Sequence, residues 1–289
     1  MKKMTFALLG IFATLTLAAC GSGNSSNSDS EAQDKLAQIQ ESGKLVIGTS
    51  PDFPPAEFYI LNENGEKEIV GSDISLAKAI AEEIGVELEI KPTDFNGVLA
   101  NIQTNSVDFG ISGFVGTDER SNIMDFSDGY QQEASTGYQG ILVKKEIADQ
   151  YATLDDLKAA NLTFGAQGGS IQYETAATLT DEKNIKQFGT MDASILALNS
   201  GDIQAVTVST SSVEPLLTTF PDLVILPKDG FDLDPEEKYA TNVIGFPKGD
   251  DTASLIELAN KVIQENKDNG NLEKWRQEAE ELAKQAIQE

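Results

Sequence analysis

The sequence of 289 residues contains no histidine and one cysteine, Cys20. Without histidine, neither a Ser-His-Asp site nor a Cys-His site can be built. The remaining metal ligands would be carboxylates, and these show no EF-hand spacing. The segment GAQGGS at 165–170 lacks the Gly-Lys-Ser/Thr of a phosphate loop and does not match GxGxxG. We therefore expect no metal, no nucleotide and no cofactor, and any catalysis would have to use carboxylates, tyrosine or lysine.

Positive charge is also scarce. The chain has 21 lysines and arginines against 47 acidic residues, a formal net charge of −26. Such a surface repels phosphate polymers, so no nucleic-acid partner is expected. At about 150 residues per domain, the length favours two lobes with cores of their own.

The first residues are typical of an exported lipoprotein. MKKMTFALLGIFATLTLAAC places Lys2 and Lys3 before an apolar run and small residues before Cys20, which indicates a signal peptide over 1–19. That run is too short to read as a spanning helix. Leu17-Ala18-Ala19-Cys20 resembles the lipobox of bacterial lipoproteins, which implies cleavage before Cys20 and acyl chains, such as palmitate, on that residue. An ordinary signal peptide followed by an incidental cysteine is the alternative.

The Gly/Ser/Asn-rich tract after Cys20 is too polar to form a core. We predict that residues 20–42 are a lipidated N-terminus and flexible tether. Removing 1–19 takes away two lysines and no acids, so the net charge changes from −26 to −28. Diacyl anchoring would hold the mature protein on the outer face of the cytoplasmic membrane.

Strand-like and helix-like segments alternate through the rest of the chain. Apolar runs bounded by glycine and polar residues predict strands, and apolar residues at helical spacing predict helices. This alternation favours an α/β fold with mainly parallel strands and helices on both faces. The predicted strands are 44–50, 86–91, 107–113, 162–167, 204–209 and 223–227, and the predicted helices are 73–85, 97–103, 193–201, 254–270 and 271–287.

Ligands of open α/β sheets bind beyond the carboxyl ends of the strands. Four segments at such ends combine small residues with hydroxyls or charge: 48–55, 112–120, 165–172 and 207–212. The third predicts a helix that begins at Ser170, whose free N–H groups would favour an anion.

The two arginines differ in their surroundings. Arg276 has Glu273 three residues before it and Glu280 four after it, so local ion pairing accounts for it. Arg120 has no acid at these spacings. A planar guanidinium binds a carboxylate through two parallel hydrogen bonds, which makes Arg120 a candidate anion receptor.

The chain also resembles a known family. GTSPDFPPAEF, the segment from VGSDISLAKAIAEEIG to DFGISG, TDERSNIMDFSDGY and IGFPKGDD are similar, in order and spacing, to signatures of the family 3 solute-binding proteins. The resemblance implies a periplasmic-binding-protein-like type II fold, in which two α/β lobes are joined by two crossover segments. It places lobe 1 at 43–134 plus 241–289 and lobe 2 at 135–240.

The resemblance implies a receptor rather than an enzyme. It would capture a polar amino acid in a closing cleft and deliver it to the permease of an ABC importer. Its expected partners are the amino acid, the permease and, through its lipid, the membrane, and we expect a monomer. The other readings are a carboxylate-dependent dehydratase or lyase on the same fold, and a surface adhesin.

The family motifs also imply the site. Arg120 would grip the ligand's α-carboxylate, Phe53 and Phe95 would flank its side chain, and Gln167 would reach that side chain. Groups that assist Arg120 match Ser112, Gly113, Val115 and Ser170.

The sequence departs from the family at two positions. Ser209 and Ser50 stand where many members carry aspartates, the first of them for the ligand's ammonium. A buried ammonium without a charged partner is costly. Either neutral acceptors hold it, or another acid substitutes, with Asp52, Glu57, Glu133 and Glu174 as candidates.

Overall fold

The computed structural model describes residues 34–132 and 137–287. The predicted signal peptide, Cys20 and Glu133 lie outside these residues. No helix within the described ranges is long and apolar enough to cross a membrane.

The described chain forms two α/β lobes, each built on a five-stranded sheet. In lobe 1, β1 is parallel to β5 and β6, while β15 is antiparallel to β6 and β7. The strands lie in the order β5 (Glu87–Pro92), β1 (Lys44–Thr49), β6 (Phe109–Gly110), β15 (Gly245–Pro247) and β7 (Met124–Phe126).

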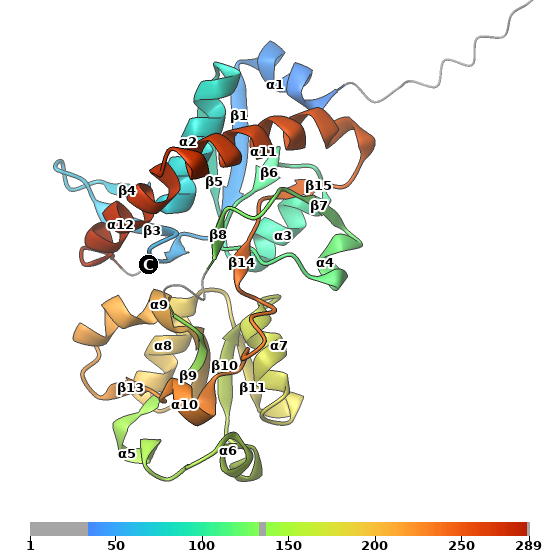
Figure 1. The fold of residues 1–289 in the computed structure, drawn as a ribbon. Helices are drawn as coiled ribbons and strands as arrows, with labels where there is room; N and C mark the ends of the chain where they lie inside the picture. The colour runs from blue at the N-terminus through green and yellow to red at the C-terminus, as the bar shows by residue number, and fades with distance from the viewer. Residues whose placement is uncertain (1–33, 133–136, 288–289) are drawn as a thin grey trace, which may run out of the picture. The chain divides into compact units, whose positions relative to one another are not determined.

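Helices cover the lobe 1 sheet, and α2, α11 and α12 pack beside one another (Figure 1). The left-handed conformation at Gly85, with φ of 84°, ends α2 at the predicted glycine. The helices of this lobe are α1 (Lys35–Ser42), α2 (Ser72–Ile84), α3 (Phe95–Gln103), α4 (Asp118–Ser121), α11 (Ala253–Asp268) and α12 (Asn271–Ala283), with the short 3-10 helix η4 (Asp250–Thr252).

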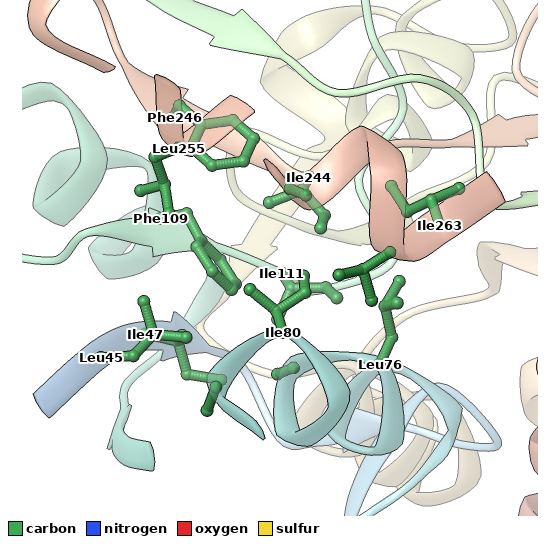
Figure 2. Close-up of a cluster of buried hydrophobic side chains, with 14 of the residues drawn as sticks. Leu45, Ile47, Leu76, Ile80, Phe109, Ile111, Ile244, Phe246, Leu255 and Ile263 are labelled. Atoms are coloured by element: carbon green, nitrogen blue, oxygen red, sulfur yellow. The ribbon is translucent and has the colours of Figure 1, made fainter. Parts of the chain in front are cut away.

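Apolar side chains from β1, α2, β6 and the C-terminal segment converge in the core of lobe 1 (Figure 2). Leu45, Ile47, Leu76, Ile80 and Phe109 are all 0% exposed. The alternating strand pattern and the helical apolar stripe therefore meet in one core, as the sequence predicts.

Helix α1 corrects the predicted tether. The sequence predicts residues 35–42 as part of that tether, but they fold as a helix whose first turn is capped by Asp34 Oδ1, which accepts from Ala37 N at 2.9 Å. Ile39 is 2% exposed in the lobe 1 core, and Lys35 pairs with Asp108 at 3.3 Å. Residues 35–42 therefore belong to lobe 1, because Ile39 and Lys35 make apolar and charged contacts with it.

A small three-stranded antiparallel sheet adjoins this lobe and consists of β2 (Asp52–Phe53), β3 (Glu57–Leu61) and β4 (Lys67–Val70). Phe53 and Glu57 are register partners across β2 and β3. The sheet thus holds an aromatic ring and a carboxyl side by side.

In lobe 2, β10 is parallel to β11 and β12, while β9 is antiparallel to β12 and β13. The strand order is β11 (Ile185–Phe188), β10 (Phe164–Gln167), β12 (Ala205–Ser209), β9 (Gln139–Lys144) and β13 (Leu223–Ile225). The helices are α5 (Lys145–Ala148), α6 (Leu154–Ala160), α7 (Ile171–Ala177), α8 (Met191–Ser200), α9 (Thr210–Val213) and α10 (Lys228–Phe231), with the 3-10 helices η2 (Glu182–Asn184) and η3 (Glu214–Thr218).

Two segments join the lobes. The chain leaves lobe 1 through β8 (Gln131–Gln132) and returns through β14 (Thr241–Asn242), and these two strands pair antiparallel. The pairing places the two crossings side by side, where a single hinge can bend both.

One predicted strand is much shorter than expected. The segment 107–113 contributes only Phe109 and Gly110 to the sheet, because the chain leaves it there and Gly113 adopts a left-handed φ of 56°. This departure carries residues 112–115 into the site described below.

Candidate functional site

A cavity with an empty volume of about 420 Å³ lies where residues of the two lobes meet. The lining residues are Asp52, Phe53, Glu57, Phe95, Ser112, Gly113, Val115, Arg120, Gln167, Ser170, Ile171 and Gln172. Most of the residues singled out from the sequence are therefore brought together, although they come from four separate segments.

Arg120 is buried in this cavity, with 5% of its surface exposed. Its helix, α4, is capped by Thr117, whose hydroxyl accepts from Arg120 N at 3.2 Å. Its Nη1 donates to the carbonyl oxygen of Val115 at 2.8 Å, and its Nη2 donates to that of Gly169 in lobe 2 at 3.0 Å. These bonds fix the plane of the guanidinium and tie it to both lobes.

Two aromatic rings flank the same guanidinium. Its central carbon lies 5.3 Å from the ring centre of Phe95 and 5.7 Å from that of Phe114. Burial lowers the pKa of Arg120, but an arginine side chain remains charged in proteins. Within the described chain Arg120 forms no salt bridge with a carboxylate. A fixed cation in a cavity is suited to bind an anionic group.

Arg276 contrasts with Arg120. It donates to Glu273 at 2.6 Å and also pairs with Glu280, both on its own helix α12. The predicted local pairing is confirmed.

The loop after β6 shapes one wall of the cavity. Gly113 lies against Phe53, and a Cβ at this glycine would come within 3.0 Å of the Phe53 ring. Ser112 Oγ donates to Glu57 Oε1 at 3.0 Å and accepts from Ser50 N at 2.9 Å. The close contact explains why a residue without a side chain occupies position 113.

Lobe 2 contributes the turn between β10 and α7. Ser170 caps α7, as predicted, and its hydroxyl accepts from Tyr173 N at 3.2 Å. Ile171 and Gln172 also line the cavity; they lie within the predicted segment 165–172 but were not among the named site residues. Their position in the first turn after the predicted cap was the available signal.

Two of the candidate acids line the cavity. Glu57 is 0% exposed, and burial together with the neighbouring Asp73 raises its pKa well above the ordinary 4.5. Asp52, 6% exposed, accepts through Oδ2 from Met191 N at 2.5 Å and from Gln167 Nε2 at 3.0 Å. Because Met191 and Gln167 belong to lobe 2, Asp52 bonds the lobes together.

Glu174 does not line the cavity. It lies on α7, and its Oε2 accepts from Tyr239 OH at 3.3 Å. It remains near enough to Arg120 to favour the charged form of that side chain.

Neither serine at the departing positions is among the residues that line this cavity. Ser50, 1% exposed, donates from Oγ to Asp52 Oδ1 at 2.8 Å. Ser209, 0% exposed, shares a 3.1 Å hydrogen bond with Ser211 and lines a smaller neighbouring cavity of about 270 Å³. Ser209 shares the lining of that smaller cavity with Phe53, Gln167 and Gln172, which also line the larger one.

Asp73 and Tyr130 were missed by the sequence reasoning. Asp73 lies in the first turn of α2, is 0% exposed, and accepts through Oδ2 from Gly113 N at 3.0 Å and from Tyr130 OH at 2.7 Å. An acid in the first turn of a helix commonly stabilises the N-terminus of that helix. This local role already accounted for Asp73, so nothing in the sequence indicated that Asp73 is buried near Glu57.

No group of three or more potential metal ligands occurs within residues 34–132 and 137–287.

Comparison with known proteins agrees with the geometry. Residues 45–278 match the family described as bacterial extracellular solute-binding proteins, family 3. The arginine-binding extracellular protein ArtP of Bacillus subtilis (strain 168) is 35% identical over 277 residues, which cover 95% of this chain and 96% of ArtP. A probable histidine-binding protein of Campylobacter jejuni is 26% identical, over 93% and 95% of the two chains.

A solved structure is similar over almost the same length. It is the amino acid ABC transporter substrate-binding protein AbpA of Streptococcus pneumoniae Canada MDR_19A bound to L-arginine, with 34% identity and a TM-score of 0.74 over 87% of this chain and all of that chain, 100%. The sequence-based fold class and family are confirmed. The chain belongs to the bacterial extracellular solute-binding proteins, family 3, and is a solute-binding receptor rather than an enzyme.

Proposed function

We propose that the protein captures an amino acid with a cationic side chain, arginine foremost, and delivers it to the permease of an ABC importer. The observation that carries this proposal is the charge arrangement of one cavity. Its lining contains one buried guanidinium, Arg120, and two buried carboxyls, Asp52 and Glu57. An amino acid with a cationic side chain presents the complement, one carboxylate and two cations.

Arg120 would bind the α-carboxylate through two hydrogen bonds. Its plane is already set by Val115, Gly169 and the two flanking rings, so little side-chain order is lost on binding. Ser170 lines the same cavity from lobe 2, where its hydroxyl donates to Gln167 O at 2.7 Å, and a carboxylate would take the place of that acceptor. A carboxylate held from both lobes stabilises the closed form.

The ligand's cations would lie toward Asp52 and Glu57. Phe53, the register partner of Glu57, places an aromatic ring beside this end of the cavity, and such a ring attracts a cation at about 0.5–2 kcal/mol. Aspartates are missing at positions 50 and 209. Of the acids that could take over their role, Asp52 lines the cavity and Glu174 does not, which favours Asp52. ArtP and AbpA, whose names or bound ligand include arginine, support the same ligand class.

A thermal-shift screen of the twenty amino acids, with ornithine and citrulline, tests the ligand class. Arginine, lysine and ornithine should raise the melting temperature more than citrulline or glutamine. The largest shift with an acidic or apolar amino acid would reject the charge assignment.

The lobe boundaries belong to the same proposal. We assign 43–134 and 241–289 to lobe 1, extended at its start to α1, and 135–240 to lobe 2. The separate sheets and the paired crossings β8 and β14 support this division. Limited proteolysis of the ligand-free protein should cut in the crossings first if the hinge lies there.

We also propose that a lipid on Cys20 anchors the protein at the outer face of the cytoplasmic membrane, and that the receptor is a monomer. The signal-like sequence before Cys20 supports the anchor. Mass spectrometry of the mature N-terminus tests the lipid, and light scattering of the protein lacking residues 1–33 tests the monomer.

A further inference from the structure

Two buried carboxyls, Glu57 and Asp73, accept hydrogen bonds from adjacent residues of the cavity wall: Ser112 Oγ donates to Glu57 Oε1 at 3.0 Å and Gly113 N donates to Asp73 Oδ2 at 3.0 Å. Glu57 on β3 and Asp73 on α2 are each 0% exposed. Glu57 lines the cavity, whereas Asp73 lies behind the wall and holds Gly113 N and Tyr130 OH.

Their hydrogen bonds are incomplete unless a proton lies between them. Within the described residues, no donor reaches Glu57 Oε2 or Asp73 Oδ1, although both atoms are buried. Two ionised carboxylates would therefore leave two buried oxygens unpartnered and would also repel each other. One proton shared between the carboxyls removes both costs, because the protonated acid donates to the ionised one.

The surrounding donors place this proton on Glu57. Asp73 accepts from a backbone N–H and from a tyrosine hydroxyl, whereas Glu57 accepts only from the Ser112 hydroxyl among these donors. More donors favour the ionised form of Asp73. Burial raises the pKa of both carboxyls, and that of Glu57 rises well above its ordinary value; the hydrogen bond between the two raises the pKa of Glu57 further and opposes the rise at Asp73.

Other ionisable groups also face the pair. Asp52 on β2 is negative and disfavours ionisation of Glu57, and Tyr130 keeps its proton because burial and Asp73 raise its pKa well above 10. Arg120, from α4, lines the same cavity and is the basic residue on its wall. The two acids that act on Glu57 are therefore Asp52 on β2 and Asp73 on α2.

We propose that Glu57 and Asp73 share one proton in the ligand-free protein and that a cationic group of the ligand, entering beside Glu57, expels it. This inference rests on the proposed function, which gives the ligand its cationic groups. The O–H bond of Glu57 breaks, the proton passes to solvent, and the ligand cation takes its place as the partner of Glu57. Glu57 thereby acts as a specificity-determining residue that holds no net charge until a cation arrives.

The linkage has a measurable consequence. When one proton leaves for each ligand bound, affinity rises with pH by about tenfold per pH unit while Glu57 remains protonated in the ligand-free form. A neutral ligand at this position expels no proton, so its affinity does not follow pH in this way.

The first test needs no ligand. Infrared spectra of the empty protein at pH 7 should contain the band of a buried protonated carboxyl, and Glu57→Gln should lack it. The amide of Gln keeps a donor toward Asp73, so this variant should keep the fold. Glu68→Gln, an exposed site on β4, is the matched control and should keep the band. Absence of the band in the wild type overturns the inference whatever the ligand is.

The second test is calorimetric titration of arginine in two buffers with different ionisation enthalpies. The wild type and Glu68→Gln should release up to one proton per arginine, and Glu57→Gln should release none. Titration with citrulline separates the two ligand cations: release with arginine alone identifies the guanidinium, and equal release with both identifies the α-ammonium. Binding of arginine without proton release contradicts the inference but leaves the proposed ligand class intact.

Discussion

Replacing Arg120 with lysine tests the proposed anchor without removing its charge. In the structure the guanidinium donates from Nη1 to Val115 O at 2.8 Å and from Nη2 to Gly169 O at 3.0 Å. A lysine ammonium is a point charge that cannot reproduce this planar arrangement or two parallel bonds to a carboxylate. Arg120→Lys should therefore bind the ligand more weakly while leaving the net charge of the cavity unchanged.

The expected loss follows from burial. Arg120 is 5% exposed, so its contact with a carboxylate would be largely desolvated. Truncating or misplacing one partner of such a pair costs about 2–4 kcal/mol, which is a loss of about 30-fold to 1,000-fold in affinity. The control is Arg276→Lys on α12, which alters an ion pair confined to one helix. Pairs of that kind contribute about 0.3–0.5 kcal/mol.

Isothermal titration with arginine measures both variants, and circular dichroism confirms that both remain folded. The reasoning predicts a large loss for Arg120→Lys and none for Arg276→Lys. Equal affinity of the wild type and a folded Arg120→Lys would refute the assignment of Arg120 as the carboxylate anchor.

Three further outcomes are expected. Burial raises the pKa of Glu57 above 4.5, so the unfolded chain loses this proton at a lower pH than the folded chain, and the wild type becomes less stable as pH rises. The melting temperature of Glu57→Gln should therefore exceed that of the wild type by more at pH 7.5 than at pH 4. An equal difference at both pH values argues against a raised pKa of Glu57. Asp52→Asn weakens the bonds to Met191 and Gln167 that cross between lobes and should enlarge the radius of gyration of the ligand-free protein by small-angle scattering; an unchanged radius contradicts an Asp52 link. Cys20→Ala should leave an uncleaved precursor or a released protein on fractionation, and a variant that is processed and membrane-retained would remove the lipid-anchor proposal.

Much of the fold followed from local patterns. The apolar runs and their flanking glycines located β1, β10, β12, α2 and α8 because strand and helix periods, and a glycine such as Gly85, are local properties. Helix α1 was missed because it is short and because its stability comes from Ile39 and Lys35, which contact residues far along the chain.

The site was predictable where a residue had no local explanation. Arg120 stood out because no acid lay at helical spacing from it, and the structure places it on the cavity wall. Asp73 was hidden because it had a sufficient local role at the start of α2, while its partners Gly113 and Tyr130 are far along the chain. A sequence pattern shows neither these contacts nor the shared proton.

Titration of the wild-type protein with L-arginine and with agmatine, which is arginine without its carboxylate, tests the central claim most directly. If Arg120 anchors the ligand's carboxylate, arginine should bind and agmatine should bind at least about 30-fold more weakly, as expected for loss of a buried charged contact. Comparable affinities for the two compounds would contradict the account.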